Sequence, residues 1–487
     1  MLFNSYEFIF IFLPLIFFIY FYLNSKRLTH ASKAFLVLSS LFFYSWWNII
    51  YLPLILISML FNYSLGNSLS NYKNNKKRFT KKSILSFGIV LNIVLLGYFK
   101  YSDFFIANFN LLTESNADLL NLALPLAISF FTFQQIAYLV DSYKEETKEY
   151  DFLNYAIFVT FFPQLIAGPI VHHKEMMPQF DILKNKVKNY KNISLGLFIF
   201  SIGLFKKVVI ADYFAVAATN GFDYSLILSF FEAWATSLSY TFQLYFDFSG
   251  YTDMAIGAAL LFNIKLPVNF NSPYKALSIQ DFWRRWHITL SRFLRDYIYI
   301  PLGGNKRGKY RTYTNLMATF ILGGFWHGAG WTFIFWGFLH GFALSLNRIW
   351  QNTGYKLWTW FAWLLTFNFL NISWIFFRAK EWEDALKVLT GMFGLSGIVL
   401  PLSLKNKLLF LEQYGVSFGG LTVNIQVNIY LFLWIIIAVF LVLFFRNANE
   451  LALKYLNKKY SYLFISVLIF YSILKLSGYS EFLYFRF

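Results

Sequence analysis

The 487-residue chain contains no cysteine. Disulfide bonds, cysteine-ligated metals and an acyl-cysteine intermediate are therefore excluded. Charged residues are scarce, because they make up only 14% of the chain, against about 25% in an average soluble domain. The full nucleotide-binding pattern Gly-x4-Gly-Lys-Ser/Thr is also absent. Neither cysteine chemistry nor a P-loop can therefore explain the function of this chain.

Apolar side chains, in contrast to charged ones, are abundant. Hydrophobic residues make up 58% of the chain, and aromatic residues alone reach 23%, with 62 Phe, 33 Tyr and 15 Trp. A soluble domain could not bury so much apolar surface, because the buried fraction rises only slowly with chain length. Lipid is the solvent that accommodates the excess, so the composition predicts an integral membrane protein.

Long apolar runs give this prediction its detail. A helix needs about 20 apolar residues to cross a hydrocarbon core ~30 Å thick, and the runs lack the period-two alternation of barrel strands. Several runs are shorter, which favours re-entrant or broken helices among them. We expect an all-α polytopic membrane protein with about 11–13 transmembrane or re-entrant helices. The runs are 8–23, 34–47, 49–65, 84–99, 119–140, 155–171, 193–210, 226–246, 313–329, 331–346, 357–377, 429–445 and 462–476.

The net charge of +18 comes from basic residues in short segments beside the apolar runs. The positive-inside rule places such segments in the cytoplasm, so the charge does not indicate a nucleic-acid partner. Residues 1–7 carry no Lys or Arg. We therefore place the amino terminus outside the cytoplasm and expect the first run to be an anchor, not a cleaved signal peptide. The predicted cytoplasmic segments are 25–33, 73–82, 184–191 and 284–311.

Ionisable residues concentrate between Tyr240 and Gly341, and such residues are functional candidates when they lie within a membrane. His327 stands there among four glycines, in the segment LGGFWHGAGW at 322–331. Glycine costs about 1 kcal/mol relative to alanine inside a helix. A substrate that approaches the imidazole closely would justify that cost, and so would tight helix packing through small residues. The pattern alone leaves both interpretations open.

A second histidine, His287, lies in the arginine-rich segment 281–295. Arginine forks bind phosphates, and tryptophan side chains suit the membrane interface. An ordinary positive-inside loop with an aromatic belt would look the same, and this segment alone favours that simpler interpretation. The candidate residues beside His287 are Asp281, Trp283, Arg284 and Arg285.

The remaining histidines give weaker signals. His172, His173 and Glu175 mimic a metal site, but adjacent histidines on a helix point in different directions. No third His or Cys lies near them in the sequence, so we do not expect a metal. We expect His340 to be structural and His30 to be a solvated loop residue.

Two carboxylates, Asp247 and Asp253, lie in an apolar region on either side of Gly250. Such a pair could bind a cation or relay protons within the membrane. It could equally hold a re-entrant turn around Gly250. The sequence does not decide between these alternatives.

Several longer blocks are similar to those of the membrane-bound O-acyltransferases, in the bacterial branch typified by the alginate O-acetyltransferase membrane subunit. Peptidoglycan O-acetyltransferase membrane subunits belong to the same branch. Blocks that recur in family order are far more specific than one short motif. They are PLAISFFTF (125–133), YLVD (138–141), PQLIAGPI (163–170), YFDFSGYTDM (245–254), NFNSPY (269–274), FWRRWHITLS (282–291), YIPLGGN (299–305) and LGGFWHG (322–328). The ending at 484–487 also resembles the family's, whereas 389–428 matches least.

The resemblance implies an MBOAT fold, one membrane domain over 1–487 in which tilted helices surround a central tunnel. Its core would be about 100–380, with peripheral helices at 1–99 and 381–487. The resemblance also implies a multi-pass protein of the bacterial inner membrane. Its donor substrate would be acetyl-coenzyme A, with no tightly bound cofactor and no metal. Because the chain has no soluble domain, an SGNH-type O-acetyltransferase outside the cytoplasm is implied as a partner.

The resemblance gives His327 the catalytic position and makes His287 the second family histidine, on the cytoplasmic side. We expect His327 to deprotonate an acceptor hydroxyl, a contribution of roughly 10²- to 10⁴-fold. A covalent acyl-histidine remains open. The residues predicted to bind the donor or line the tunnel are Trp326, Phe325, Trp283, Arg284, Arg285, Asp281, Asp247 and Asn305.

The acceptor is the least defined part of this hypothesis. We favour peptidoglycan, with an alginate-like exopolysaccharide as the alternative, and a relative of the family serves teichoic acid D-alanylation. A transporter for a polysaccharide or lipid precursor would also explain many spans and buried charges. A membrane scaffold is a third reading. Both predict that His327 is dispensable for function.

Overall fold

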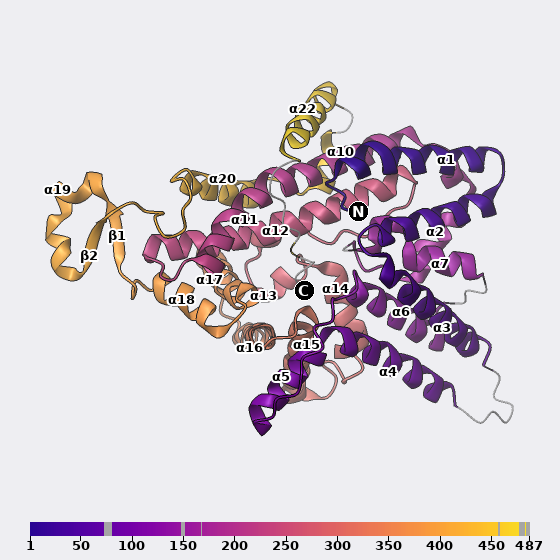
Figure 1. Cartoon of the computed structure of the whole chain (residues 1–487), viewed down its shortest axis with the longest axis horizontal. Coiled ribbons are helices and arrows are strands. Elements are labelled where there is room, and N and C mark those ends of the chain that lie inside the picture. Colours follow the sequence, from indigo (N-terminus) through magenta and orange to yellow (C-terminus); the bar gives the residue numbers. More distant parts are fainter. Residues whose placement is uncertain (73–79, 148–150, 167, 456–457, 477–482, 484–487) are drawn as a thin grey trace. The chain divides into compact units, whose positions relative to one another are not determined.

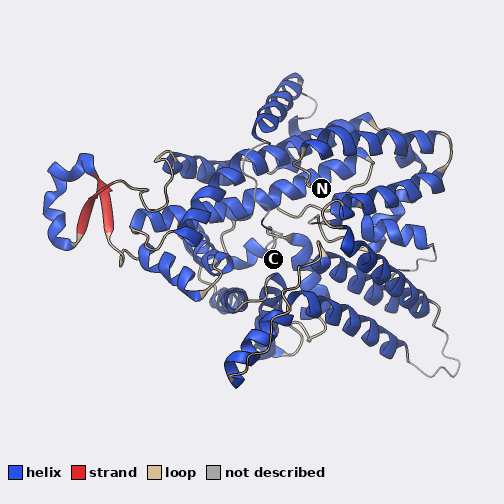
Figure 2. Cartoon of the chain, in the orientation of Figure 1, coloured by secondary structure: helices blue, strands red, loops and turns tan. Residues whose placement is uncertain are grey.

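The computed structural model describes residues 1–72, 80–147, 151–166, 168–455, 458–476 and 483. Helices make up almost all of their regular structure (Figure 1), and one pair of four-residue strands is the exception (Figure 2). The predicted all-α fold class is confirmed. Most of the predicted cytoplasmic segment 73–82, and all of 484–487, lie outside the described residues.

The chain folds into two compact units whose segments alternate along the sequence. Unit 1 comprises Met1–Leu204, Tyr251–Val268 and Leu451–Phe470. Unit 2 comprises Phe205–Gly250, Asn269–Glu450 and Tyr471–Phe487. The limits of these units do not coincide with the core and peripheral boundaries expected from the sequence. The single membrane domain with those boundaries therefore stays a prediction.

Unit 1 is built mainly from the first half of the chain, together with part of α12, a helix described below. Its further helices are η1 (Glu7–Phe12), α1 (Leu13–Ser25), α2 (Thr29–Ser45), η2 (Ile49–Tyr51), α3 (Leu52–Ser70), α4 (Lys81–Lys100), α5 (Ser102–Thr113), α6 (Ile128–Tyr143), α7 (Phe152–Thr160), α8 (Phe162–Leu165), α9 (His173–Asp181), η3 (Leu183–Lys186) and α10 (Tyr190–Phe205). Phe8 is fully buried there, with its ring centroid 5.8 Å from Phe43 and 6.0 Å from Phe162. Edge-to-face pairs at such distances add about 0.5–1.5 kcal/mol each beyond the area that they bury.

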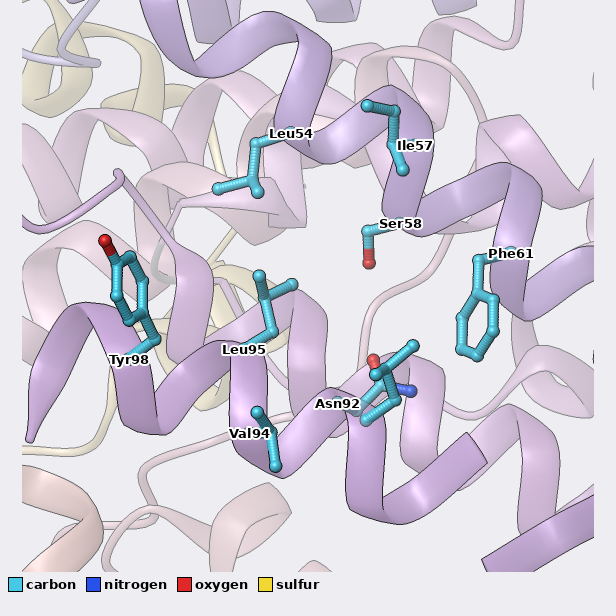
Figure 3. Close-up of a pocket in the computed structure, with 9 residues that line it drawn as sticks. Leu54, Ile57, Ser58, Phe61, Asn92, Val94, Leu95 and Tyr98 are labelled. Carbon is cyan, nitrogen blue, oxygen red and sulfur yellow. The ribbon is translucent and has the colours of Figure 1, made fainter. Parts of the chain in front are cut away.

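A buried polar network lies where α3, α4 and α6 meet in unit 1. Asn92 Nδ2 donates to Asn62 Oδ1 over 2.7 Å, and Asn62 Nδ2 donates to Gln135 Oε1 over 2.5 Å. Buried amides need such partners, so the network fixes how these apolar helices pack. A cavity of about 410 Å³ between α3 and α4 reaches Ser58 and Asn92 (Figure 3). Its lining includes none of the predicted site residues.

Unit 2 contains all ten residues that the sequence singled out for the site. Its elements are η4 (Lys206–Ala211), α11 (Asp212–Thr219), η5 (Asn220–Tyr224), the first part of α12 (Phe230–Leu261), η6 (Pro273–Lys275), α13 (Ile279–Trp283), α14 (Ile288–Leu294), η7 (Arg295–Tyr299), α15 (Gly308–His327), α16 (Trp331–Thr353), α17 (Thr359–Arg378), α18 (Trp382–Met392), β1 (Ile398–Pro401), η8 (Leu402–Leu404), α19 (Lys405–Leu408), η9 (Leu409–Tyr414), β2 (Val416–Gly419) and α20 (Leu431–Phe444). The helices α21 (Ala448–Tyr455) and α22 (Lys459–Lys475) are divided between the units.

Small residues let α15 and α16 approach closely in unit 2. A Cβ atom on Gly324 would lie 2.3 Å from the Phe333 carbonyl oxygen, and one on Gly337 would lie 2.3 Å from the Phe320 carbonyl oxygen. No side chain fits at either position, which is how small residues serve helix pairs in membranes. Only three residues connect the two helices, so the end of α15 lies beside the start of α16.

Five helices of the described residues are long and apolar enough to cross a membrane, or six if the bent pair α20 and α21 counts as one. A multi-pass membrane protein is thus supported, while the count of 11–13 crossings stays a prediction. The five are Glu7–Ser25, Ile49–Ser70, Lys81–Lys100, Tyr190–Tyr224 and Thr359–Arg378.

Two predicted runs are not continuous helices. In the run 119–140 the helix starts only at Ile128, because Ala127 takes a left-handed conformation with φ 59°. The run 155–171 breaks at Phe161, whose ψ of 108° is not helical. Pro163 follows closely, and proline both lacks an N–H and restricts the residue before it. Hydropathy registers neither of these local breaks.

Candidate active site

His327 is the last residue of α15, and only 6% of its surface is exposed. Its ring centroid lies 5.3 Å from that of Trp336 on α16 and 5.0 Å from that of Phe377 on α17. Trp326 precedes it, with a centroid distance of 4.9 Å. The helix ends here because Gly328 is extended. Three helices therefore place one imidazole among aromatic rings.

The glycines around His327 face protein atoms. A Cβ on Gly324 would meet the backbone of Phe333, and one on Gly328 would lie 2.2 Å from the Phe333 ring. Gly323 faces the side chain of Leu294. The helix-packing interpretation of this glycine cluster therefore accounts for Gly324 and Gly328. A role for His327 has to be argued from the imidazole itself and from its surroundings.

His340 is fully buried and fully hydrogen-bonded. Trp283 Nε1 donates to its Nδ1 over 3.1 Å, so its Nε2 must carry the proton that faces Ser373 Oγ at 3.2 Å. Ser373 Oγ in turn donates to the Leu370 carbonyl. Both ring nitrogens thus connect α13 to α16 and α17. This arrangement agrees with the structural role expected of His340.

His287 differs from His340 in having one ring nitrogen without a partner among the described residues. Its Nδ1 lies 3.2 Å from Asn269 Oδ1, and that oxygen also accepts from the Thr289 backbone N–H at 3.1 Å. A backbone N–H can only donate, so Asn269 presents its oxygen and His287 Nδ1 carries the proton. The buried Nε2 is therefore a free acceptor. Such an atom is suited to a hydroxyl or amide N–H of a substrate.

The backbone and the protonation state of His287 are both unusual. It caps α14 in a left-handed conformation, with φ 43° and ψ 52°, and such conformations cost of order 1–3 kcal/mol for residues other than glycine. His287 lies outside the helices that qualify as spans, and burial lowers its pKa to about 3. Its ring is therefore neutral at physiological pH, which keeps Nε2 available as an acceptor.

A continuous series of aromatic rings connects the surroundings of the two histidines. Trp286, adjacent to His287, lies 5.0 Å from Trp374, and Trp374 lies 5.7 Å from Trp336, measured between centroids. Trp336 then contacts His327. The predicted tunnel residue Trp283 joins this series at 6.0 Å from Trp336. The tunnel and its lining stay a prediction.

Three predicted donor-binding residues lie around the end of α13. Arg285 Nε donates to Asp281 Oδ1 over 2.9 Å, and both side chains are about one-third exposed. This pairing takes up part of the charge that a phosphate would need. Arg284 is exposed. Of the two arginines, Arg284 is therefore the better placed to meet a phosphate from solvent.

Asn305 and Phe325 lie at opposite ends of α15. Asn305 is exposed in the turn before the helix, whereas Phe325 is half-buried two residues before His327. A 20-residue helix is about 30 Å long. The structure therefore does not bring Asn305 together with His327. The basic segment 306–311 lies at the Asn305 end.

Asp247 belongs to a buried ion cluster that the sequence did not indicate. Lys207 Nζ lies 2.6 Å from Asp247 Oδ1 and 2.7 Å from Asp212 Oδ1, and the Lys207 side chain is 1% exposed. The Leu483 backbone N–H also donates to Asp247, over 3.4 Å. Lys207 lies in η4, a π-helical turn whose last hydrogen bond joins the Asp212 N–H to the Lys207 carbonyl.

Of the two alternatives for Asp247 and Asp253, the structure excludes the re-entrant turn around Gly250. Asp247, Gly250 and Asp253 all lie inside the continuous helix α12. The unit boundary falls between Gly250 and the next residue, so Asp253 belongs to unit 1. Asp247 is held by an ammonium group and not by a turn. Its donor-binding role stays a prediction.

His172 and His173 lie in unit 1, where His172 Nδ1 is 3.3 Å from Asp141 Oδ2. His173 packs against Tyr138 and Phe158. Within the part of the chain that the structure describes, no three His, Cys, Asp or Glu residues come together as a metal site.

Comparison with known proteins places these residues in a wider context. Residues 17–380 match the model of MBOAT, the membrane-bound O-acyltransferase family. The chain is 56% identical over 430 residues to a peptidoglycan O-acetyltransferase of Helicobacter pylori, which covers 82% of this chain and 81% of that protein. It is 39% identical over 400 residues to the "Probable alginate O-acetylase AlgI" of Pseudomonas aeruginosa, covering 81% and 75%. It is also 30% identical over 241 residues to a teichoic acid D-alanyltransferase of Streptococcus thermophilus, covering 46% and 57%.

Proposed function

Because the chain belongs to the membrane-bound O-acyltransferase family, we propose that it moves acetyl from cytoplasmic acetyl-coenzyme A across the membrane to O-acetylate a polysaccharide, with His327 as its catalytic base. The chain is an acyltransferase and a multi-pass membrane protein. The observation that carries the site is the buried imidazole of His327 at the junction of α15, α16 and α17.

Peptidoglycan is the end acceptor that we favour. The relative named for peptidoglycan is 56% identical over 82% of the chain, whereas the alginate O-acetylase is 39% identical over a similar share. The D-alanyltransferase matches only 46% of the chain. An alginate-like exopolysaccharide is the alternative acceptor, supported by the second relative.

The chemistry needs a base and a dry site but no nucleotide. His327 removes the proton of the acceptor hydroxyl as its oxygen attacks the thioester carbonyl. The carbon–sulfur bond then breaks, and the coenzyme A sulfur leaves and takes up the proton. Trp336 and Phe377 keep water away from the acetyl group, so that transfer outcompetes hydrolysis. The chain has no cysteine to hold the acetyl as a thioester.

His287 positions the donor in this scheme. Asn269 fixes its tautomer, so Nε2 accepts a hydrogen bond from an amide N–H of the pantetheine arm. Trp283 at the end of α13, four residues before His287, donates to His340. His340 lies nine residues beyond the start of α16, which is about 14 Å along that helix. The start of α16 lies beside His327, so His287 lies farther than His327 from that end of the helix pair.

Charge supports the direction of transfer. The segment 306–311, at the start of α15, carries four basic residues and no acidic one, so the positive-inside rule favours the cytoplasm for that end. His327 then lies at the end of α15 nearer the outside. The same rule supports an extracytoplasmic amino terminus, and the similarity to bacterial O-acetyltransferases supports the inner membrane. We propose an SGNH-type O-acetyltransferase outside the cytoplasm as the partner that receives the acetyl group.

Release of coenzyme A is the direct test. The purified chain in proteoliposomes receives acetyl-coenzyme A on the side of segment 306–311, with a short alcohol as acceptor. Because the chain has no cysteine, a thiol reagent reports released coenzyme A alone. We expect release that requires the alcohol and yields its acetyl ester. Absence of release with acetyl-coenzyme A and with carrier-linked acetyl thioesters would contradict the proposal and favour a transporter.

Replacing Asn269 with alanine should lower kcat/KM about tenfold, the equivalent of one net hydrogen bond. The His287 ring would lose the contact that sets its tautomer. Asn269→Asp keeps an acceptor oxygen and should retain most activity. In the double variant Asn269→Ala/His287→Ala the losses should not add, because both remove the same interaction. Additive losses in coenzyme A release would show that Asn269 does not act through His287.

A further inference from the structure

Residues 393–430, between α18 and α20, form a small lobe of unit 2 that we call the strand lobe. Its strands β1 and β2 pair in parallel from Ile398↔Val416 to Pro401↔Gly419. The turns η8, α19 and η9 form the crossover between them, at the left of Figure 1 and around the red arrows of Figure 2. The lobe lies beyond residues 17–380, which match the family model. The shared chemistry therefore does not account for it.

The strand lobe exposes large apolar side chains and few charges. Its only charged residues are Lys405, Lys407 and Glu412. Exposed apolar side chains that no part of the same protein covers point to an interaction site when they gather in one region. Nine large apolar residues each expose 51–78% of their surface: Phe393, Leu395, Leu402, Leu409, Phe410, Tyr414, Val423, Ile429 and Tyr430.

The base of the strand lobe is firmly held. The buried carboxylate of Glu232 accepts from the Asn424 backbone N–H over 2.7 Å and from Asn424 Nδ2 over 2.8 Å. Ser225 Oγ donates to the Asn424 carbonyl, and Asn220 Nδ2 donates to the Ile425 carbonyl. These bonds tie the lobe to η5 and α12. Its apolar surface is therefore presented on a fixed support.

The lobe continues from the end of α17 that carries Phe377 beside His327. Thr332 Oγ1 donates to the Ala379 carbonyl at that end. From there α18 leads to the lobe over 11 residues, about 16 Å. The basic segment 306–311 lies at the other end of α15, so the positive-inside rule puts the strand lobe outside the cytoplasm. The other end of α20 supports this orientation. Residues 445–458, which follow α20, carry three basic residues and one acidic residue, so the same rule favours the cytoplasm for them.

Lipid is a poor occupant for this surface. Each strand of the described sheet has a single partner, so its other edge presents unpaired backbone groups. Open sheet edges do not occur in hydrocarbon, where each unsatisfied group costs several kcal/mol. Parallel strands are also normally covered on both faces. A protein satisfies both needs, because it can cover the apolar side chains and pair with a strand edge.

We propose that the strand lobe is the docking surface for the extracytoplasmic protein that receives the acetyl group. This inference rests on the function proposed above. The partner presents an apolar face to η9, around Phe410 and Tyr414, and can extend the sheet at β1 or β2. Docking there holds the partner on the side of the membrane where His327 delivers acetyl.

The absence of cysteine permits a direct test with single-cysteine variants of the full chain. Phe410→Cys and Tyr414→Cys, in cells that lack the unmodified chain, are labelled from outside with a bulky membrane-impermeant maleimide. The label should lower the O-acetyl content of the cell wall at least tenfold at both positions. Release of coenzyme A by the same labelled variants in proteoliposomes, with a short alcohol, should stay unchanged. Asn116→Cys, exposed on a loop of unit 1, is the control. After labelling it should keep both cell-wall acetylation and release of coenzyme A.

The outcomes separate the two proposals. Cell-wall acetylation that stays at its full level after labelling at both lobe positions would overturn the docking surface. So would an equal loss of cell-wall acetylation after labelling of Asn116→Cys. Neither result would contradict the proposed acyltransferase activity. Absence of coenzyme A release before labelling would contradict the proposed function itself. Loss of release only after labelling would also overturn the docking surface, because the lobe would then act on the chemistry.

A second measurement tests whether the strand lobe lies in the bilayer or outside it. An environment-sensitive dye on Phe410→Cys is compared with the same dye on Leu433→Cys in α20, in vesicles of phosphatidylethanolamine and phosphatidylglycerol with nitroxide-labelled chains. We expect at least fivefold weaker quenching by the nitroxides at position 410 than at 433. Equal quenching would place the strand lobe in the bilayer and overturn the proposal.

Discussion

Replacing His327 with alanine should slow acetyl transfer by roughly 10²- to 10⁴-fold, the usual contribution of a positioned general base. The loss should appear in kcat, because the proton leaves the acceptor hydroxyl only in the transition state. Coenzyme A release from reconstituted protein measures it. In this variant, the space that the imidazole ring vacates between Trp336 and Phe377 would be apolar. Added imidazole should therefore restore part of the rate, which a purely structural histidine would not show.

His340 supplies the matched control, since it is also buried and contacts the same Trp336. His340→Gln should lower the thermal stability of the protein, because the bonds from Trp283 and to Ser373 are disturbed. Protein that remains folded should keep a kcat near that of the unmodified chain. Equal loss of kcat in the two variants, or full activity in His327→Ala, would contradict the assignment of His327 as the base.

Replacing Lys207 with methionine should lower the free energy of unfolding by about 3–5 kcal/mol, because breaking a buried ion pair leaves a charge uncompensated. Here the ammonium group contacts two carboxylates, Asp212 and Asp247, at 2.7 and 2.6 Å. Methionine has a similar length and fills the same space. The fraction of folded protein during titration with a denaturing detergent in mixed micelles measures the change.

The triple variant Lys207→Met/Asp212→Asn/Asp247→Asn removes the charges together. It should recover most of the lost stability, because neutral amides do not require the ammonium group. Asp247→Asn alone should cost less than Lys207→Met, since Lys207 keeps Asp212. If the triple variant is less stable than Lys207→Met, the cluster is not held by charge.

The sequence predicted the fold class, and it singled out His327 and His287 as candidates whose roles stay predictions, because those signals are local. Long apolar runs require lipid-facing helices, and His327 and His287 stand in motifs that resemble one family in order and spacing. Family membership is then confirmed by the match over 17–380. Among the predicted donor-binding residues the two arginines were chosen for their charge, and charge cannot tell the paired Arg285 from the exposed Arg284.

The partners of these residues were not predictable, because they lie far away in the sequence. Asn269 orients His287 from 18 residues away, and Asp247 meets Lys207 from 40 residues away. Lys207 sits in an apolar run and carries no motif, so nothing in the local pattern marks it as buried and paired. The alternative of a turn at Gly250, which the sequence left open, is excluded for a related reason. A single glycine is tolerated in a helix whose neighbours all pack.

The π-helical turn η4 has a consequence for the length of the chain. In an uninterrupted α-helix, residues five apart point about 140° away from each other, yet Asp212 and Lys207 face the same way. The wider turn, closed by the Asp212 N–H and the Lys207 carbonyl, accommodates one more residue than an α-turn while the flanking helices keep their faces. A relative that lacks one residue between Lys207 and Asp212 could retain the same ion cluster. Elsewhere in α10, the same deletion would turn every preceding side chain by about 100°. This short stretch is therefore where the helix is free to vary in length.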